Sequence, residues 1–204
     1  MDIPGLPADD LLRRAHAGDD DARGRLLEAN RGYLTLLGRV QLGRDLQGKV
    51  DPSDLVQEAF LEAHRDFRQF QGQTDAELRA WLRRLLTTTL ADQVRRHRST
   101  RRRDLRLERQ LAAALDRSSQ ALERGLAAPD SSPSARAERR EEAVRLAEAL
   151  ERLPADYRDV LLLRHFEGLT FPDIARRLDK TLDVVKNVWM RGLARLRRTL
   201  EEKA

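Results

Sequence analysis

The chain has 204 residues, of which 36% are charged and 4% aromatic, with no cysteine and a formal net charge of +5. This composition favours helices over sheets, excludes disulfides and thiolate zinc sites, and leaves no apolar run near the roughly 20 residues of a membrane span. The four histidines are too distant in sequence to bind a metal as a pair on one helix, and the first residues lack a signal-peptide pattern. We therefore expect a soluble, cytoplasmic protein without cofactor, metal or membrane insertion.

Helical patterning begins near residue 8 and continues to about residue 97. A short helix, DDLLRRAHA, should end at Gly18. The acidic residues Asp19 to Asp21 then favour the start of a long helix over residues 22–42, because negative charge stabilises the first turn of a helix. The segment Asp51-Pro52-Ser53 is another strong helix start. No β-branched alternating run of useful length competes with this helical pattern.

The helix predicted over residues 53–67 has two different sides when it is projected at 100° per residue. One side is an apolar stripe that should face the core: Leu55, Val56, Ala59, Phe60, Ala63 and Phe67. The opposite side carries Asp54, Gln57, Glu58, Leu61 and Arg65. A solvated face accounts for the charges, and single exposed leucines are common. The alternative is a docking face for a partner, polar around one apolar contact.

The loop QGQTD separates this segment from a last long helix over residues 76–97. Its core-facing positions are Leu78, Leu82, Leu85 and Thr89. Other positions carry an aromatic, basic and hydroxyl set, namely Trp81, Arg84, Thr88, Arg95 and Arg96, and further arginines follow at 98 and 101–103. An aromatic on a basic surface can stack single-stranded bases, at about 1–3 kcal/mol per base. The alternative is an ordinary half-buried tryptophan that closes a small core.

Residues 99–140 differ in composition from the segments on either side. STRRRDLRLERQ is basic, and the following residues are rich in serine, alanine, proline and charge with little apolar periodicity. Such a composition is typical of a flexible linker, which allows a frayed helix in its first half. Helical periodicity returns at Glu141. The sequence therefore predicts an all-α fold of two small helical domains, residues 1–98 and 141–204, joined by a flexible linker over 99–140.

The last third of the chain has the pattern of a helix-turn-helix preceded by another helix. Thr170 followed by Asp173 resembles a capping box, with Pro172 in the first turn, where a missing N–H costs nothing. An apolar set then recurs at helical spacing: Ile174, Ala175 and Leu178. Thr181 can cap a second helix. Three valines of that helix should face inward: Val184, Val185 and Val188.

The outward positions of the second helix are Leu182, Asp183, Lys186, Asn187 and Arg191. From Val184 to Leu200 the helix carries five basic residues and no acid. Polar groups in the first turns and a basic far end suit base edges and phosphates in a major groove of DNA. The alternative is a helical hairpin with a solvated basic face.

Together these segments resemble a bacterial RNA polymerase sigma factor of the sigma-70 family, in its extracytoplasmic-function (ECF) subfamily. DPSDLVQEAFLEAHRDFRQF is similar to the second conserved segment of the promoter-melting domain, and AELRAWLRRLLTTTLADQVRRH to the segment that follows it. LPADYRDVLLLRHFEGLTFPDIARRLDKTLDVVKNVWMRGLARLR is similar to the −35-reading domain. The order and spacing of these motifs around a linker are more specific than any one motif.

The resemblance implies a transcription initiation factor that directs core RNA polymerase to promoters and is not an enzyme. Its partners would be the β′ and β subunits of core polymerase and promoter DNA, with an anti-sigma factor as a further candidate. The face that grips the β′ coiled coil would consist of Asp54, Gln57, Glu58 and Leu61.

The resemblance also places the −10 element of the promoter against the first domain. The loop residues Gln71, Gly72, Gln73 and Thr74 would hold an extruded base, because base capture outside the stack requires a pocket. The helix that follows would contact the −10 DNA through Trp81, Arg84 and Thr88 near the melted strand, and through Arg95 and Arg96 near its duplex edge. The −35 element would be contacted by Thr181, Asp183, Lys186, Asn187, Arg191 and Arg195.

Three residues depart from the family pattern. Thr89 stands where asparagine is common, which weakens or reorganises any hydrogen bond from that amide. Asp179 occupies a turn position that is usually glycine, and aspartate tolerates the left-handed conformation only in part. Gly192 replaces a common alanine, at a cost in helix propensity of roughly 1 kcal/mol.

Two other functions fit parts of the same pattern. An autonomous helix-turn-helix regulator with an N-terminal sensor domain would bind duplex DNA by itself, usually as a symmetric dimer. A helical adaptor would use its basic helices to bind acidic partners. The sequence offers no nucleophile paired with a base, no phosphate-binding glycine loop and no metal set. DNA binding with and without core polymerase separates the three functions.

Overall fold

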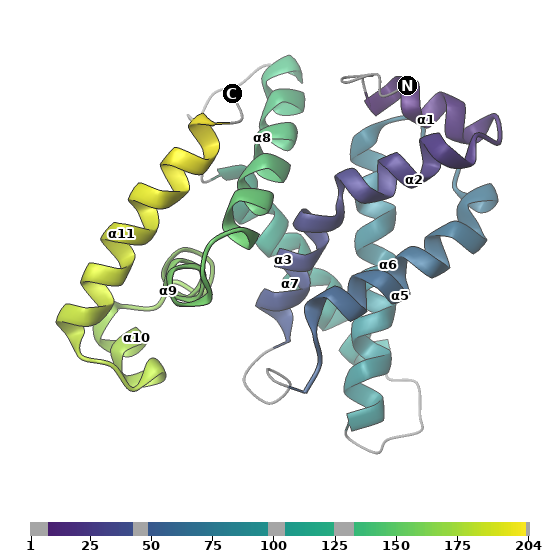
Figure 1. The fold of residues 1–204 in the computed structure, drawn as a ribbon. Coiled ribbons are helices and arrows are strands. Elements are labelled where there is room, and N and C mark those ends of the chain that lie inside the picture. Colours follow the sequence, from purple (N-terminus) through teal and green to yellow (C-terminus); the bar gives the residue numbers. More distant parts are fainter. Residues whose placement is uncertain (1–7, 43–48, 98–104, 125–132, 203–204) are drawn as a thin grey trace. The chain divides into compact units, whose positions relative to one another are not determined.

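The computed structural model describes residues 8–42, 49–97, 105–124 and 133–202. Within these ranges the regular elements are helices, and no strand occurs (Figure 1). The helices belong to two compact units, Met1–Asp116 and Arg117–Ala204. The predicted all-α fold of two helical domains joined by a linker is confirmed.

Helix α1 ends, and helix α2 begins, near the residues that the sequence marked. Helix α1 (Ala8–His16) is followed by Gly18, whose φ of 93° suits glycine and few other residues. Asp19 caps α2 (Asp20–Ala29), because its carboxylate accepts a hydrogen bond from the Ala22 N–H at 2.9 Å. This local chemistry fixes the turn between the two helices.

The long helix predicted over residues 22–42 is in fact two helices. The chain turns at Asn30, between α2 and α3 (Arg31–Gln41). The Asn30 amide nitrogen donates to the Leu26 carbonyl at 2.9 Å, and the side chain is buried. Asparagine side chains compete with the backbone for such bonds, which explains the break that apolar periodicity alone did not predict.

The remaining core of the first unit comes from α5 (Pro52–Asp66), the 3₁₀ turn η1 (Phe67–Gln69) and α6 (Asp75–His97). Asp51 caps α5 by accepting from the Ser53 N–H at 2.8 Å. The predicted apolar stripe is buried throughout: Leu55, Val56, Ala59, Phe60, Ala63 and Phe67. It packs between α3 and α6, so the opposite side of α5 is left to solvent.

Helices also occupy part of the stretch whose composition predicted a flexible linker. Helix α7 (Leu105–Arg124) and the first turns of α8 (Pro133–Glu151) lie within residues 99–140. Leu115 and Leu122 are fully buried on α7. With the leucines at 107 and 111 they follow a helical spacing, which the charged and small residues between them obscure in the sequence.

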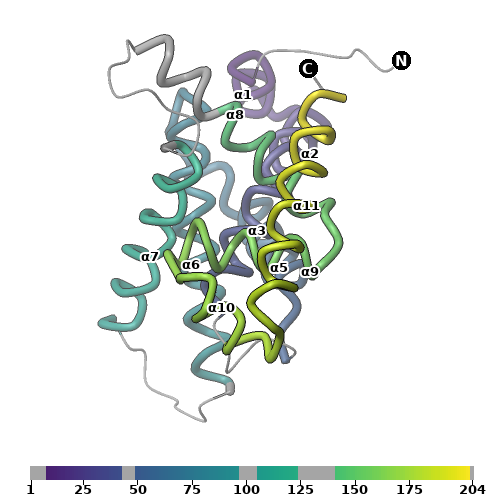
Figure 2. The backbone as a smooth tube through the Cα atoms, turned by 90° about the vertical axis from the view of Figure 1, so that its left-hand side faces the viewer, coloured from purple at the N-terminus to yellow at the C-terminus, as the bar shows by residue number. Residues whose placement is uncertain are grey.

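The second unit contains the predicted helix-turn-helix and its lead-in helix (Figure 2): α9 (Ala155–His165), α10 (Phe171–Leu178) and α11 (Leu182–Glu201). Their small core contains Val160, Leu163, Ile174, Ala175 and Val185. Val188 packs against it as predicted, but Val184 is 44% exposed, which corrects its predicted inward position. Val184 lies about 100° around the helix from Val185, and of these two residues only Val185 belongs to the small core.

The turn between α10 and α11 adopts a backbone conformation that is unfavourable for the aspartate in it. Asp179 has φ 52° and ψ 47°, the left-handed region, and its N–H donates to the Ala175 carbonyl. Both predicted caps are present, since Thr170 accepts from the Asp173 N–H at 3.3 Å and Thr181 accepts from the Val184 N–H at 3.4 Å. A non-glycine residue therefore bears the backbone strain of this turn.

Replacing Asp179 with glycine should stabilise the second unit. The left-handed conformation costs most L-residues roughly 1–2 kcal/mol and glycine almost nothing, so we expect the free energy of unfolding to rise by about 0.5–1 kcal/mol. Urea unfolding of the full chain, followed by tryptophan fluorescence that includes Trp189, measures the change. Asp179→Ala should shift the midpoint in the opposite direction, and equal midpoints for the two variants would contradict the strain.

Candidate functional site

The solvent side of α5 is the first candidate surface. Three of its predicted residues are exposed: Asp54, Gln57 and Leu61. Leu61 is 56% exposed although it is a leucine at the centre of a polar face. Glu58 is more restricted, because its carboxylate accepts from Gln93 at 3.2 Å and pairs with Arg96 at 3.5 Å, both on α6. The face therefore has an open apolar centre and one carboxylate tied to the next helix.

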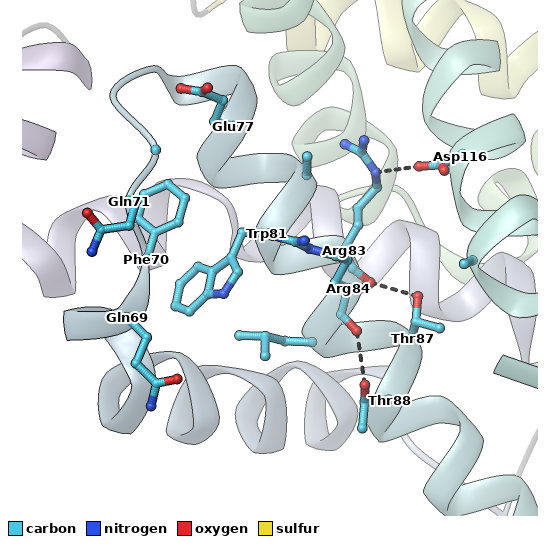
Figure 3. A pocket seen from close by; sticks show the side chains of 14 residues that line it. Gln69, Phe70, Gln71, Glu77, Trp81, Arg83, Arg84, Thr87, Thr88 and Asp116 are labelled. Carbon is cyan, nitrogen blue, oxygen red and sulfur yellow. Dashed lines mark hydrogen bonds and ion pairs between the residues drawn. The ribbon is translucent and has the colours of Figure 1, made fainter. Parts of the chain in front are cut away.

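A hollow of about 860 Å³ opens in the first unit beside α6 (Figure 3). Its lining comes from η1 and the loop after it, from α6 and from α7. Five residues predicted to meet the −10 element belong to this lining: Gln71, Gly72, Trp81, Arg84 and Thr88. Leu85, predicted to face the core, is half-buried and also lines the hollow. The fold thus brings two residues of the loop and three positions of one helix to a common space.

Stacked rings form one wall of the hollow. The Phe70 ring lies 5.0 Å from the Trp81 ring and 5.7 Å from the His16 ring, with interplanar angles of 25° and 14°. Phe67 meets Trp81 edge-on at 6.0 Å. Trp81 is half-buried, so it packs on the core with one part of its ring and lines the hollow with another (Figure 3). Sequence reasoning did not single out Phe70 or His16.

The loop Gln71–Thr74 is held by the carboxylate of Glu77. One oxygen, Oε2, accepts from the Gln73 N–H at 2.9 Å, from the Thr74 N–H at 3.0 Å and from the Thr74 hydroxyl at 2.9 Å. These bonds, the one from Gln73 foremost, lower the pKa of Glu77 because they stabilise the ionised carboxylate. Glu77 was not among the predicted residues, although the Thr-x-x-Glu spacing of a capping box marks it in the sequence.

The arginines of α6 differ in how freely they could meet DNA. Arg84 and Arg96 are exposed. Arg95 is restricted by Asp92 and, at 3.4 Å, by Glu108 of α7. Other arginines of the predicted cluster, at 98 and 101–103, lie outside the described residues. Only part of the predicted basic surface is therefore available without breaking an ion pair.

Asp116, a second carboxylate of α7, pairs with Arg83 of α6, an arginine that the sequence did not single out. Arg83 donates to the Asp116 carboxylate at 3.0 Å (Figure 3). It also donates to the Tyr33 hydroxyl at 3.1 Å. Arg83 and Asp116 both line the hollow. No local pattern identifies this group, because its three members come from α3, α6 and α7.

The outer face of α11 is open along its length. The predicted −35 residues Asp183, Lys186, Asn187, Arg191 and Arg195 are all exposed. Thr181 is exposed as well, but its hydroxyl is engaged in capping the helix. Gly192 faces the opposite way and is buried, and a Cβ there would lie 3.4 Å from both Tyr157 and Leu161. The glycine therefore lets α11 approach α9 closely, which accounts for its place in the helix.

A ring pair supports α11 from within the second unit. The Trp189 indole N–H donates to His165 Nε2 at 3.2 Å, and the two rings are stacked at 6.4 Å. This bond requires a neutral imidazole. Partial desolvation and then the charge of Arg164 lower the pKa of His165, which favours the neutral form.

Family models match both units of the chain. The model of sigma-70 region 2 matches residues 31–100, and that of sigma-70 region 4 matches residues 143–196. Together they cover more than half of the chain. The chain belongs to the sigma-70 family. Sigma factors direct RNA polymerase to promoters, and this sigma factor shares that function; a self-contained helix-turn-helix regulator is not favoured.

Several relatives of this sigma factor carry the ECF designation. It is 28% identical over 191 residues to the ECF RNA polymerase sigma factor SigM of Mycobacterium tuberculosis (strain ATCC 25618 / H37Rv), covering 94% of this chain and 83% of the relative. It is 30% identical over 147 residues to the ECF RNA polymerase sigma factor SigE of Mycolicibacterium smegmatis, covering 72% of this chain and 51% of the relative. These relatives place it in the ECF group.

A third relative is longer than this sigma factor. The chain is 28% identical over 192 residues to the probable RNA polymerase sigma factor RfaY of Xanthomonas campestris, covering 94% of this chain and 44% of the relative. It therefore spans less than half the length of that protein.

Two kinds of feature were not found within the described parts of the sigma factor. No helix there combines the length and the apolar character needed to cross a membrane. No group of three or more histidine or carboxylate side chains there could hold a metal ion.

Acidification should weaken the second unit through His165. Since the pKa of His165 is lowered in the folded chain, its contribution to stability is complete above the ordinary value of 6.5 and is lost as the pH falls through the folded value. Protonated Nε2 cannot accept from Trp189, so tryptophan fluorescence should change in the same pH window. His165→Gln keeps an acceptor but does not titrate, and an unchanged pH response in that variant would assign the effect to another group.

Proposed function

We propose that this ECF sigma factor binds core polymerase through α5, captures and melts the −10 element beside α6, and reads the −35 element through α11. In this proposal residues 1–98 form the domain for core binding and −10 melting, 99–140 the linker, and 141–204 the −35 domain. The β′ and β subunits, promoter DNA and an anti-sigma factor are the proposed partners. The hollow beside α6 is the observation that carries the proposal.

The chemistry of the hollow suits an unpaired base. Trp81 offers an aromatic face, Arg84 an exposed positive charge for phosphate, and Thr88 a hydroxyl on the same helix. Removing a base from the duplex costs a few kcal/mol, and stacking on an aromatic side chain returns about 1–3 kcal/mol per base. Stacking and phosphate contacts together can therefore offset the opening of a short stretch. Gln71, Gln73 and Thr74 supply the polar groups of the loop, and Arg95 and Arg96 the basic end of α6.

The exposed side of α5 suits a partner with an apolar contact and surrounding polar groups. Leu61 provides the contact, and Asp54 and Gln57 provide the polar surroundings. A central apolar residue with a polar rim is the usual arrangement of a protein interface. Glu58 would reach the partner only by sharing its carboxylate with Arg96, or by releasing it.

The exposed side of α11 suits base edges near its start and phosphates farther along. Asp183, Lys186 and Asn187 lie in the first two turns, where a recognition helix meets base edges. Arg191 and Arg195 follow on the same outer surface. Thr181 contributes through the cap that sets where the helix begins.

Two arginines introduced on α5, Gln57→Arg with Leu61→Arg, should abolish binding to core polymerase. The change buries unpaired charge at the centre of the proposed contact, so we expect affinity to fall at least about a hundredfold. Both sites are exposed, so the thermal melt should not change. Co-purification with core polymerase measures the effect.

A matched control adds two arginines elsewhere in the first unit. Ala17 and Ala29 are exposed and lie off α5, so Ala17→Arg with Ala29→Arg should leave core binding intact. A gel shift on promoter DNA tests the function itself, since wild-type protein should shift the DNA only when core polymerase is present. A shift by the wild-type protein alone would favour an autonomous regulator, and core binding retained by the α5 variant would remove the docking assignment.

Asn187 and Arg195 should affect −35 recognition in different ways. Asn187→Ala should relax the preference at one −35 base pair, at about 1–3 kcal/mol for the preferred base, because a base-edge contact carries sequence information. Arg195→Ala should weaken binding on all sequences about equally and reduce the salt slope by about one, as a phosphate contact does. Selection from a promoter library with each variant measures both effects. An unchanged −35 preference in Asn187→Ala would shift base reading to Lys186 and Asp183.

A further inference from the structure

The loop Gln71–Thr74 is anchored from two directions by residues that are not in the proposed DNA-contacting set. Glu77 anchors its C-terminal end through the three hydrogen bonds to Oε2. His16, from α1, anchors its middle, because the imidazole Nε2 donates to the Gly72 carbonyl at 2.8 Å. Glu77 and His16 belong to different helices, so the loop is clamped between α1 and the start of α6.

The anchor at His16 also reaches the aromatic wall of the hollow. The His16 ring stacks on Phe70, and Phe70 stacks in turn on Trp81. One imidazole therefore holds the loop backbone through Nε2 and supports the aromatic wall through its face. Helix α1 lies before the residues matched by the region 2 model, so the family match does not account for this contact.

Gly72 shows how closely the loop is pressed onto these groups. A Cβ at this position would lie 2.3 Å from Cζ of Phe70 and 2.8 Å from Cβ of Glu77. Since real Cβ atoms do not approach that closely, a side chain here would displace the loop or the Phe70 ring. The loop backbone consequently keeps a fixed position relative to the Phe70–Trp81 stack.

We propose that His16 and Glu77 are positioning residues that hold the loop 71–74 in one conformation and thereby set the base preference at a single −10 position. The inference rests on the proposed role of the loop in capturing a −10 base. Neither residue needs to touch DNA. A preorganised loop meets the captured base with its polar groups already in place, whereas a released loop presents several arrangements and discriminates less between bases.

The two anchors can be removed separately by substitutions that keep part of their chemistry. Glu77→Ala removes the acceptor, while Glu77→Gln keeps a side-chain oxygen and still fits a capping box. His16→Ala removes both the donor and the ring, while His16→Gln keeps N–H donors but cannot stack on Phe70. The Gln variants therefore distinguish the hydrogen bonds from the bulk of each side chain.

The test is selection from a promoter library, randomised at the −10 and −35 elements, by core polymerase with each full-length variant. Glu77→Ala and His16→Ala should reduce the preference at one and the same −10 position by about tenfold, the scale of a lost charge-assisted or side-chain hydrogen bond. Other −10 positions and the whole −35 preference should stay unchanged. Glu77→Gln should recover most of the preference and His16→Gln part of it.

Asp173→Ala is the matched control, because Asp173 belongs to a capping box of the same kind in the second unit and should leave the −10 preference as it is. Amide exchange in the free chain provides a second measurement, in which the Gln73 and Thr74 N–H groups should exchange about tenfold faster in Glu77→Ala. Equal losses at every −10 position, or an unchanged preference in both Ala variants, would overturn the positioning role. A wild-type holoenzyme without any −10 preference would instead refute the underlying role of the loop.

Discussion

The stack of Phe70 on Trp81 is the contact on which the surface of the first unit depends. It joins the end of η1 to α6, and it covers only part of the Trp81 ring. The tryptophan can therefore stabilise the core and line an open hollow at once. Because Gly72 leaves no room for a side chain beside Phe70, the loop that borders the hollow follows the same stack. The same ring stack therefore packs the core of the first unit and positions the loop and the tryptophan that line the hollow.

Ion pairs distinguish the basic residues of α6 from those on the outer face of α11. On α6, Arg83 and Arg95 are paired with carboxylates of α7, and Arg96 with Glu58 of α5. On α11, the lysine and arginines of the outer face lie exposed on a stretch with no acid between residues 184 and 200. Arg84 is exposed, but Arg83, Arg95 and Arg96 of the first unit would have to exchange internal ion pairs for phosphate contacts, whereas α11 offers its charges directly. DNA contact by the two units should consequently differ in its dependence on salt.

Local chemistry explains why much of the fold could be predicted. Caps at Asp19, Asp51, Thr170 and Thr181 each use a side chain within three residues of the N–H that it binds. The apolar stripe of α5 and the outward face of α11 follow from the helical repeat alone. At Asn30 a competing local preference was overlooked, and there the prediction differed from the structure. In residues 99–140 the sequence allowed a frayed helix, and the leucine spacing of α7 accounts for a longer and regular one.

The sequence by itself determined the all-α fold, the helix-turn-helix with its caps, and most of the residues of α5 and α11 that face solvent, because these depend on neighbours within a few positions along the chain. Only the tertiary structure decided which distant groups meet. His16 reaches the Gly72 carbonyl across 56 residues, and Glu58 meets Gln93 across 35. Such contacts depend on how helices pack at particular distances and angles, and no periodicity or spacing in the sequence encodes those directly.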